Sequence, residues 1–233
     1  MSASRELDIV LFGATGVTGT YVLQELHRSC EGLRWGVAGR DADKLRRTLR
    51  TAASDLDLKE DALDRVPIIV ANVEDNASLL AMAQRTRLVL NTVGPYRFFG
   101  RSVVAACVNS GTHHIDVSAE VQYMEQMLLE FYDEARNKNT LVLMACGFGS
   151  IPAEMCPLLH AKKFPSFPAG DLEEVESYMR IKQGPLGMNL NYGTWESIIH
   201  MVAHASELVP LRQQNRERVF TKPLPERQSR LAR

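Results

Sequence analysis

Short apolar runs alternate with amphipathic segments from residue 8 to residue 144. The runs are rich in β-branched residues, which is typical of strands buried on both faces of a parallel sheet. The predicted strands are Asp8–Phe12, Trp35–Ala38, Ile68–Ala71, Leu88–Thr92, His114–Val117 and Leu141–Met144. The predicted helices between them are Val17–Ser29, Asp43–Ala53, Asn76–Arg85, Ser102–Asn109 and Val121–Asn137. This alternation predicts an α/β fold, a Rossmann-type doubly wound parallel sheet with right-handed crossovers.

The pattern changes after Pro152. Val175–Ile181 alternates apolar and polar positions like a half-exposed antiparallel strand, and residues 193–209 form an amphipathic pattern that predicts a helix with Thr194 as its N-cap. We therefore expect three parts. They are an NAD(P)-binding Rossmann domain over 1–150, an incomplete α+β domain for substrate or dimerisation over 151–211, and a basic, flexible tail over 212–233.

Charge and composition exclude several classes of protein. The net charge is −1, which gives no argument for a nucleic-acid partner, although residues 212–233 hold seven Lys or Arg against two Asp or Glu. The four cysteines form no C-x-x-C pair and are expected to be free thiols. The N-terminus lacks the apolar core of a secretory signal and no apolar run is long enough to cross a membrane, so we expect an intracellular protein.

Three glycines follow the first predicted strand in the stretch IVLFGATGVTGTYVLQEL, residues 9–26. The first glycine would allow the turn, the second would let the backbone approach a pyrophosphate, and the third would let the helix pack on the sheet. The start of that helix would face the phosphates with its partial positive charge. The residues predicted to bind a dinucleotide here are Gly13, Ala14, Thr15, Gly16, Val17, Thr18 and Gly19.

The end of the second predicted strand favours NADP over NAD. Arg40 stands where NAD enzymes usually have a carboxylate, and its guanidinium suits a 2′-phosphate, with Lys44 adding charge one turn later. Asp41, one position late, keeps NAD open. Asn72 is expected near the adenine or as a cap for the next helix. The cofactor's ribose and nicotinamide are expected beside Asn91, Thr92, Val93 and Gly94.

Familiar catalytic arrangements do not fit. The Tyr178 and Lys182 pair falls on a predicted strand, where the two lie ~13 Å apart, unlike the helical pair of a short-chain dehydrogenase. Glu196, His200 and His204 share a helix face but show no fourth ligand, so no metal site is predicted. The catalytic candidates are polar groups at or just after the ends of predicted strands, at the edge where such sheets bind ligands: Tyr96, Asp116 and Glu120.

Several blocks occur in the order found in one known family. GATGVTG, VAGRDADKL, LNTVGPYRFFG, HIDVSAE, GFGSIPAEM and GTWES resemble the saccharopine dehydrogenase-like oxidoreductases from about Leu7 to Ala203. The resemblance implies a Rossmann domain followed by an α+β domain that walls a substrate cleft. It implies NAD(P)-linked hydride transfer to a small or lipid-derived substrate, with Gly13 to Gly19, Arg40 and Asn91 to Gly94 at the cofactor.

The resemblance also implies a location at lipid droplets or membranes, by peripheral association, with cytoplasmic or mitochondrial locations and homo-oligomerisation left open. Two departures stand out. Gly149 replaces the aspartate usual in the family's G-F-D-S-I-P block, and the chain is shorter than typical members, as expected of a partial or truncated one. Both features keep an alternative open, a non-catalytic NADP-binding module or lipid-droplet adaptor.

Overall fold

A parallel sheet forms the centre of the molecule. The computed structural model describes residues 5–163, 175–176, 178–180, 182, 184–185, 187 and 189–220. The strands of the sheet, all parallel, run in the order β3-β2-β1-β4-β5-β6. Their bounds are β1 Leu7–Phe12, β2 Trp35–Gly39, β3 Ile68–Val70, β4 Thr86–Asn91, β5 His113–Asp116 and β6 Val142–Leu143. The predicted Rossmann-type sheet is thereby confirmed.

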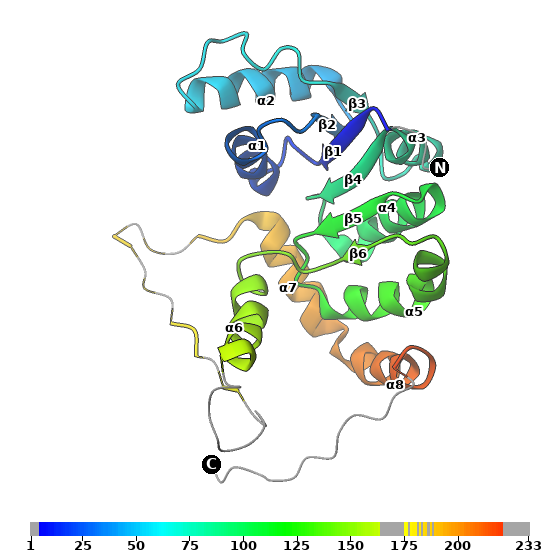
Figure 1. Cartoon of the computed structure of the whole chain (residues 1–233). Coiled ribbons are helices and arrows are strands. Elements are labelled where there is room, and N and C mark those ends of the chain that lie inside the picture. Colours follow the sequence, from blue (N-terminus) through cyan, green and yellow to red (C-terminus); the bar gives the residue numbers. More distant parts are fainter. Residues whose placement is uncertain are drawn as a thin grey trace.

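Helices cover both faces of the sheet (Figure 1). Helices α1 (Val17–Ser29) and α2 (Ala42–Asp55) lie on one face, and α3 (Asn76–Arg85), α4 (Tyr96–Ser110) and α5 (Val121–Asn137) lie on the other. The helices that follow β1 and β2 lie on one face, and those that follow β3, β4 and β5 lie on the other. The direction of strand order therefore reverses between β1 and β4, the two central strands. A sheet of this kind opens a ligand crevice at that switch point, outside the carboxyl ends of the strands.

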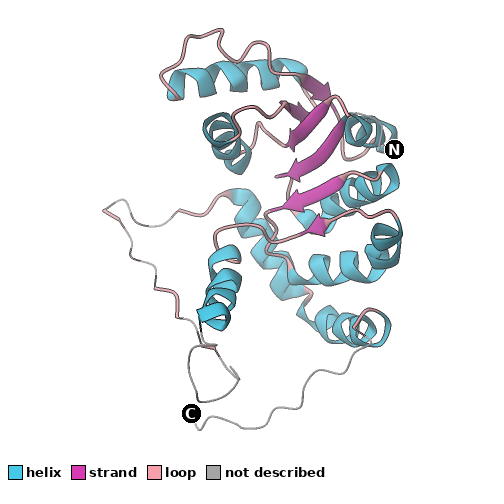
Figure 2. Cartoon of the chain, viewed as in Figure 1, coloured by secondary structure: helices cyan, strands magenta, loops and turns pink. Residues whose placement is uncertain are grey.

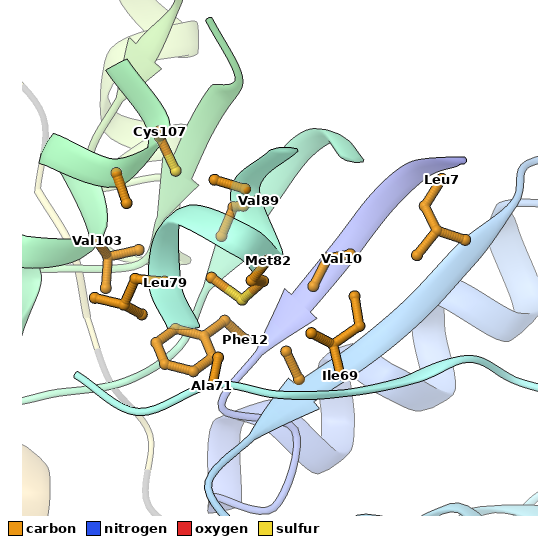
Figure 3. Close-up of a cluster of buried hydrophobic side chains, with 13 residues drawn as sticks. Leu7, Val10, Phe12, Ile69, Ala71, Leu79, Met82, Val89, Val103 and Cys107 are labelled. Carbon is orange, nitrogen blue, oxygen red and sulfur yellow. The ribbon is translucent and has the colours of Figure 1, made fainter. Parts of the chain in front are cut away.

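The alternation of side chains along β1 divides the core into two layers. Val10 and Phe12 point toward α3 and α4, where they pack with Met82 and Val103 (Figure 3). Leu11 points to the opposite face and packs in the cluster that α1 and α2 cover. Because both faces of β1 are buried, its sequence is almost continuously apolar, as expected for a central parallel strand.

Most predicted elements are observed within one or two residues, but α4 is longer than expected. It begins at Tyr96, six residues before the predicted start at Ser102. The carboxylate of Glu120 accepts hydrogen bonds from the backbone N–H groups of Tyr96 and Arg97, each at 2.8 Å. These bonds satisfy two N–H groups that the start of a helix leaves without a partner. A cap supplied from another segment leaves no local sequence signal.

After β6 the described part of the chain contains helices and no strand (Figure 2). These elements are α6 Ile151–Lys163, α7 Tyr192–Ala203, the short 3₁₀ turn η2 Ala205–Glu207, and α8 Leu208–Arg218. The N-cap of α7 is Asn191, so the prediction of Thr194 is wrong by three residues. The predicted strand Val175–Ile181 lies partly outside the described residues, and its described positions form no strand.

Helix α8 packs against α5, and the expected start of the basic tail at residue 212 falls inside α8. Asn215 is buried there and donates to the carbonyl oxygen of Glu125 at 2.9 Å and to its Oε2 at 2.7 Å. Residues 212–218 are therefore helical, since tertiary contacts outweigh their polar composition.

Residues 221–233 lie outside the described part, and the division into domains stays a prediction. No helix in the described ranges combines the length and apolar character needed to cross a bilayer.

Candidate cofactor site

Two of the three glycines after β1 have no room for a side chain. Gly13 has a φ of +94°, and a Cβ there would lie 2.8 Å from Val93 Cγ2. A Cβ on Gly19 would lie 2.1 Å from the carbonyl oxygen of Gly13. The first glycine thus allows the chain to turn out of β1, and the last lets α1 pack directly on that turn.

Gly16 is different, because the space beside it is open. It is the N-cap of α1, where no side chain of the described chain makes a capping bond and the first turn holds no acidic residue. The closest atom to a Cβ on Gly16 would be Gly13 O, at 3.4 Å. Gly16, Val17 and Thr18 are exposed at this helix start. Free N–H groups at an uncapped helix start, with room for close approach, fit the phosphates of a dinucleotide.

A cavity of about 310 Å³ lies in front of this helix start. Gly16, Val17 and Thr18 form one wall of it, and Thr92, Gly94 and Tyr96 contribute from the end of β4 and the start of α4. The remaining lining comes from the β5–α5 loop and from α7: Val117, Ala119, Glu120, Asn191, Gly193, Thr194 and Ser197. Figure 1 shows the start of α7 near the carboxyl ends of β4 and β5.

The loop after β4 is held across the end of β1. Thr92 Oγ1 donates to Phe12 O at 3.0 Å, and Asn91 Oδ1 accepts from Val93 N at 3.0 Å. Asn91 is fully buried, and its Nδ2 has no hydrogen-bond partner in the described part of the chain. A buried donor without a partner costs free energy, but Asn91 does not itself line the cavity described above.

Asp116, at the end of β5, is fully buried and holds the surrounding segments together. Its Oδ1 accepts from Ser118 Oγ at 2.7 Å, Ser118 N at 3.0 Å and Ala145 N at 3.1 Å. Its Oδ2 accepts from the Tyr123 hydroxyl at 3.0 Å. Asp116 does not line the cavity described above, and its bonds fix the β5 and β6 ends behind it.

Tyr96 lines the cavity but is largely buried. Its hydroxyl donates to the carbonyl oxygen of Asn91 at 3.0 Å, and its ring lies 5.6 Å from that of Tyr123. Burial, and then the negative charge of Asp116, raises the pKa of Tyr96 well above its usual value. The same two causes raise the pKa of Tyr123. Both phenols therefore keep their protons at neutral pH.

Glu120 also lines the cavity, and its two oxygens accept from three donors. Besides the backbone N–H groups of Tyr96 and Arg97, Glu120 Oε1 accepts from Ser197 Oγ at 2.8 Å. One carboxylate thus joins the starts of α4 and α5 to α7. The three catalytic candidates lie close to one another around the starts of α4 and α5, but each has protein partners.

Arg40, Lys44 and Asn72 follow β2 and β3 at the same edge of the sheet, on the other side of β1, and do not line the cavity. Arg40 and Lys44 are exposed. Asn72 Oδ1 accepts from Glu74 N at 3.2 Å, which stabilises the turn before α3. Asp41 caps α2 by accepting from Lys44 N at 2.9 Å, and this bond lowers the pKa of Asp41.

Comparison with known proteins identifies the family. Residues 9–143 match the sequence model of the saccharopine dehydrogenase NADP-binding domain, which is more than half of the chain. The chain belongs to the saccharopine dehydrogenase-like oxidoreductase family. Its predicted membership is thus confirmed, and it contains an NADP-binding domain of that family.

Relatives resemble most of this chain but are longer. A human saccharopine dehydrogenase-like oxidoreductase is 38% identical over 214 residues, covering 89% of this chain and 49% of the relative. A Caenorhabditis elegans protein named lipid droplet localized protein is 38% identical over 194 residues, covering 82% and 44%. The chain therefore spans about half the length of these curated relatives.

A solved structure agrees on the fold. Saccharopine dehydrogenase (L-Glu forming) from Saccharomyces cerevisiae superposes with a TM-score of 0.53 at 13% identity, covering 68% of this chain and 31% of that one.

The α7 wall of the cavity lies beyond the family's matched domain, and sequence reasoning did not assign it to the site. The block GTWES, residues 193–197, supplies three of its lining residues, and its place among the family's blocks was the available signal.

Gly149, which replaces the aspartate usual in the family's G-F-D-S-I-P block, is exposed. A Cβ there would meet no atom within 4 Å in the described structure. Among the described residues no group of three or more His, Cys, Asp or Glu is arranged to hold a metal ion.

Proposed function

We propose that this chain is an NADP-dependent oxidoreductase that transfers hydride between the nicotinamide and a small or lipid-derived substrate. The observation that carries the proposal is the turn from Gly13 to Gly19, which opens an uncapped helix start onto a cavity inside the family's NADP-binding domain. The phosphates of a dinucleotide would accept hydrogen bonds from the free N–H groups at the start of α1.

The proposed contacts follow the order of the strands. The start of α1 holds the pyrophosphate, and Arg40 with Lys44 holds the 2′-phosphate beyond β2. Asn72 lies toward the adenine, and the loop from Asn91 to Gly94 lies beside the nicotinamide ribose. The capping role of Asp41 supports NADP over NAD, because the carboxylate already binds the start of α2.

Bound NADPH would supply the hydride, and the chain would supply position and protons. Tyr96 is the tyrosine that lines the cavity, and its Oη keeps its proton at neutral pH. Its bond to Asn91 O fixes that hydroxyl at the loop proposed to hold the nicotinamide ribose. Glu120 orients the start of α4, and Asp116 orients the strand ends behind it. We assign proton donation to Tyr96 and positioning to both carboxylates.

A second candidate function, a non-catalytic NADP-binding module, is favoured by one observation. Asp116 and Glu120 each accept from several protein donors, and Tyr96 donates to a backbone carbonyl, so all three candidates have structural partners. Gly149 adds to this reading because it removes the family's usual carboxylate.

Deuterium transfer separates the two functions. The purified chain is incubated with NADPH deuterated at the nicotinamide C4 and a panel of enoyl, aldehyde and ketone substrates with short and long acyl chains. The oxidoreductase proposal predicts deuterium in one product class, and Tyr96→Phe should slow that transfer without weakening NADPH binding. Saturable NADPH binding with no label in any product would favour the non-catalytic module.

We extend the proposal to a lipid surface as the place of action. The name of the Caenorhabditis elegans relative supports it, as do Ile151, Met155, Leu158 and Leu159, apolar side chains of α6 that are about half exposed. Flotation with phospholipid-coated triolein droplets tests it. Binding should fall when Leu158 and Leu159 are both replaced by Ser, and a wild-type chain that stays in the aqueous fraction would contradict it.

A further inference from the structure

Ser197 connects α7 to the proposed cofactor cavity. Its hydroxyl donates to Glu120 Oε1 at 2.8 Å, the same oxygen that accepts from Tyr96 N. Glu120 Oε2 accepts from Arg97 N. Because hydrogen bonds to an ionised carboxylate are among the strong ones, this group ties α7 to the first turn of α4.

The position of Ser197 in the cavity indicates which half of a dinucleotide it would face. Ser197 and Thr194 line the same cavity as the start of α1, Thr92 and Gly94. Arg40, on the other side of β1, does not line it. The α7 wall would therefore face the nicotinamide half of a bound dinucleotide rather than its adenosine half.

Helix α7 is held in this place at its other end as well. Gln122 Nε2 donates to the carbonyl oxygens of Met201 at 2.8 Å and His204 at 3.2 Å. The rings of Phe98 and His200 lie 4.8 Å apart, edge to face.

Beyond the end of α7, Arg97 forms an ion pair with Glu207 at 2.8 Å. The segment from α7 to η2 is thus fixed against the starts of α4 and α5, which keeps Ser197 directed at Glu120.

We propose that Ser197 is a positioning residue for the nicotinamide half of the cofactor. Its bond to Glu120 holds the α7 wall against the cavity, so that α7 closes beside the nicotinamide while the β1–α1 turn and Arg40 hold the adenosine half. This inference rests on the proposed cofactor function and adds a residue outside the NADP-binding domain to it.

The test compares two ligands on one variant. NADPH contains both halves, whereas 2′,5′-ADP carries the adenosine and its 2′-phosphate without the nicotinamide. Ser197→Ala should weaken NADPH binding by about tenfold, the usual effect of one lost hydrogen bond to a charged group, and leave 2′,5′-ADP binding unchanged. Ser197→Thr, which keeps the hydroxyl, should bind NADPH like the wild type. Ser206→Ala is the matched control, since Ser206 is exposed in the turn after α7.

The outcomes separate this inference from the function on which it rests. Equal affinities of Ser197→Ala and wild type for NADPH, or equal losses for both ligands, would overturn the role of Ser197 while leaving cofactor binding in place. A wild-type chain that binds neither ligand would overturn the proposed function and this inference together.

Discussion

Gly16 and Gly19 occur in one turn but have different steric surroundings. A Cβ on Gly19 would overlap Gly13 O, a backbone atom that cannot turn aside, whereas a Cβ on Gly16 would lie at ordinary contact distance from the same oxygen. One glycine is thus needed by the fold, and the other is open for a ligand. The sequence indicated the motif, but the division of roles follows from these distances.

Alanine substitutions should separate the two roles. Gly19→Ala should lower the free energy of unfolding by about 1–3 kcal/mol or more, because α1 must move away from the turn. Gly16→Ala should unfold like the wild type but bind NADPH roughly tenfold more weakly, as one phosphate loses a close N–H group. Urea unfolding and a fluorescence titration measure both effects. Equal stability of the two variants would contradict the steric role assigned to Gly19.

His114 is a second residue whose surroundings the sequence did not reveal. It is fully buried in β5, and neither ring nitrogen has a hydrogen-bond partner within the described part of the chain. Burial lowers the pKa of His114 to about 4, against the opposing effect of the Asp116 charge. His113, its neighbour, faces the other side of the sheet and accepts from Leu141 N through Nδ1 at 3.1 Å.

This burial predicts acid sensitivity. As pH falls below 6.5 the unfolded chain protonates His114 first, so stability declines until the folded pKa near 4 is reached. The slope from this residue is about 1.4 kcal/mol per pH unit. His114→Leu should reduce the loss in unfolding free energy between about pH 7.5 and about pH 5, whereas His113→Gln should keep it. An unchanged loss in His114→Leu would assign the acid sensitivity to other groups.

At the scale of elements, local patterns located the strands and most helices, but long-range contacts set the remaining ends. Helices α1, α3 and α5 have the bounds that periodicity predicts. Helix α4 begins early because Glu120, distant in sequence, caps it, and the N-cap of α7 is Asn191 rather than Thr194. The cap on α4 depends on how two segments meet in space, so no local signal could have predicted it.

The cap on α4 can be removed without touching the helix itself. Glu120→Ala leaves the N–H groups of Tyr96 and Arg97 without their acceptors and should cost about 1–3 kcal/mol of unfolding free energy. Amide hydrogen exchange at Tyr96 and Arg97 should accelerate more than at Val103, in the middle of α4. Glu120→Gln keeps the shape and one acceptor oxygen, so its loss should be smaller. Unchanged exchange at Tyr96 in Glu120→Ala would contradict the capping role.

For the whole molecule, the Rossmann sheet could be predicted from the sequence, because buried parallel strands and the glycine turn leave local signatures. The family could be predicted from ordered blocks such as LNTVGPYRFFG and GFGSIPAEM. The arrangement after β6 could not. Asn215 is polar and lies in a basic segment, yet it is buried against α5, and Ser197 reaches the cavity from outside the matched domain. Both contacts depend on how α7 and α8 pack against α4 and α5, which cannot be predicted from composition.

The most direct test of the account is a titration of the purified chain with NADPH and with NADH, beside Arg40→Ala. The account predicts tighter binding of NADPH, and a variant that loses this preference while its affinity for NADH is unchanged, because Arg40 would contact only the 2′-phosphate. Arg28→Ala, at the far end of α1, should behave like the wild type. Equal binding of both cofactors by the wild type, or no binding of either, would contradict the central claim.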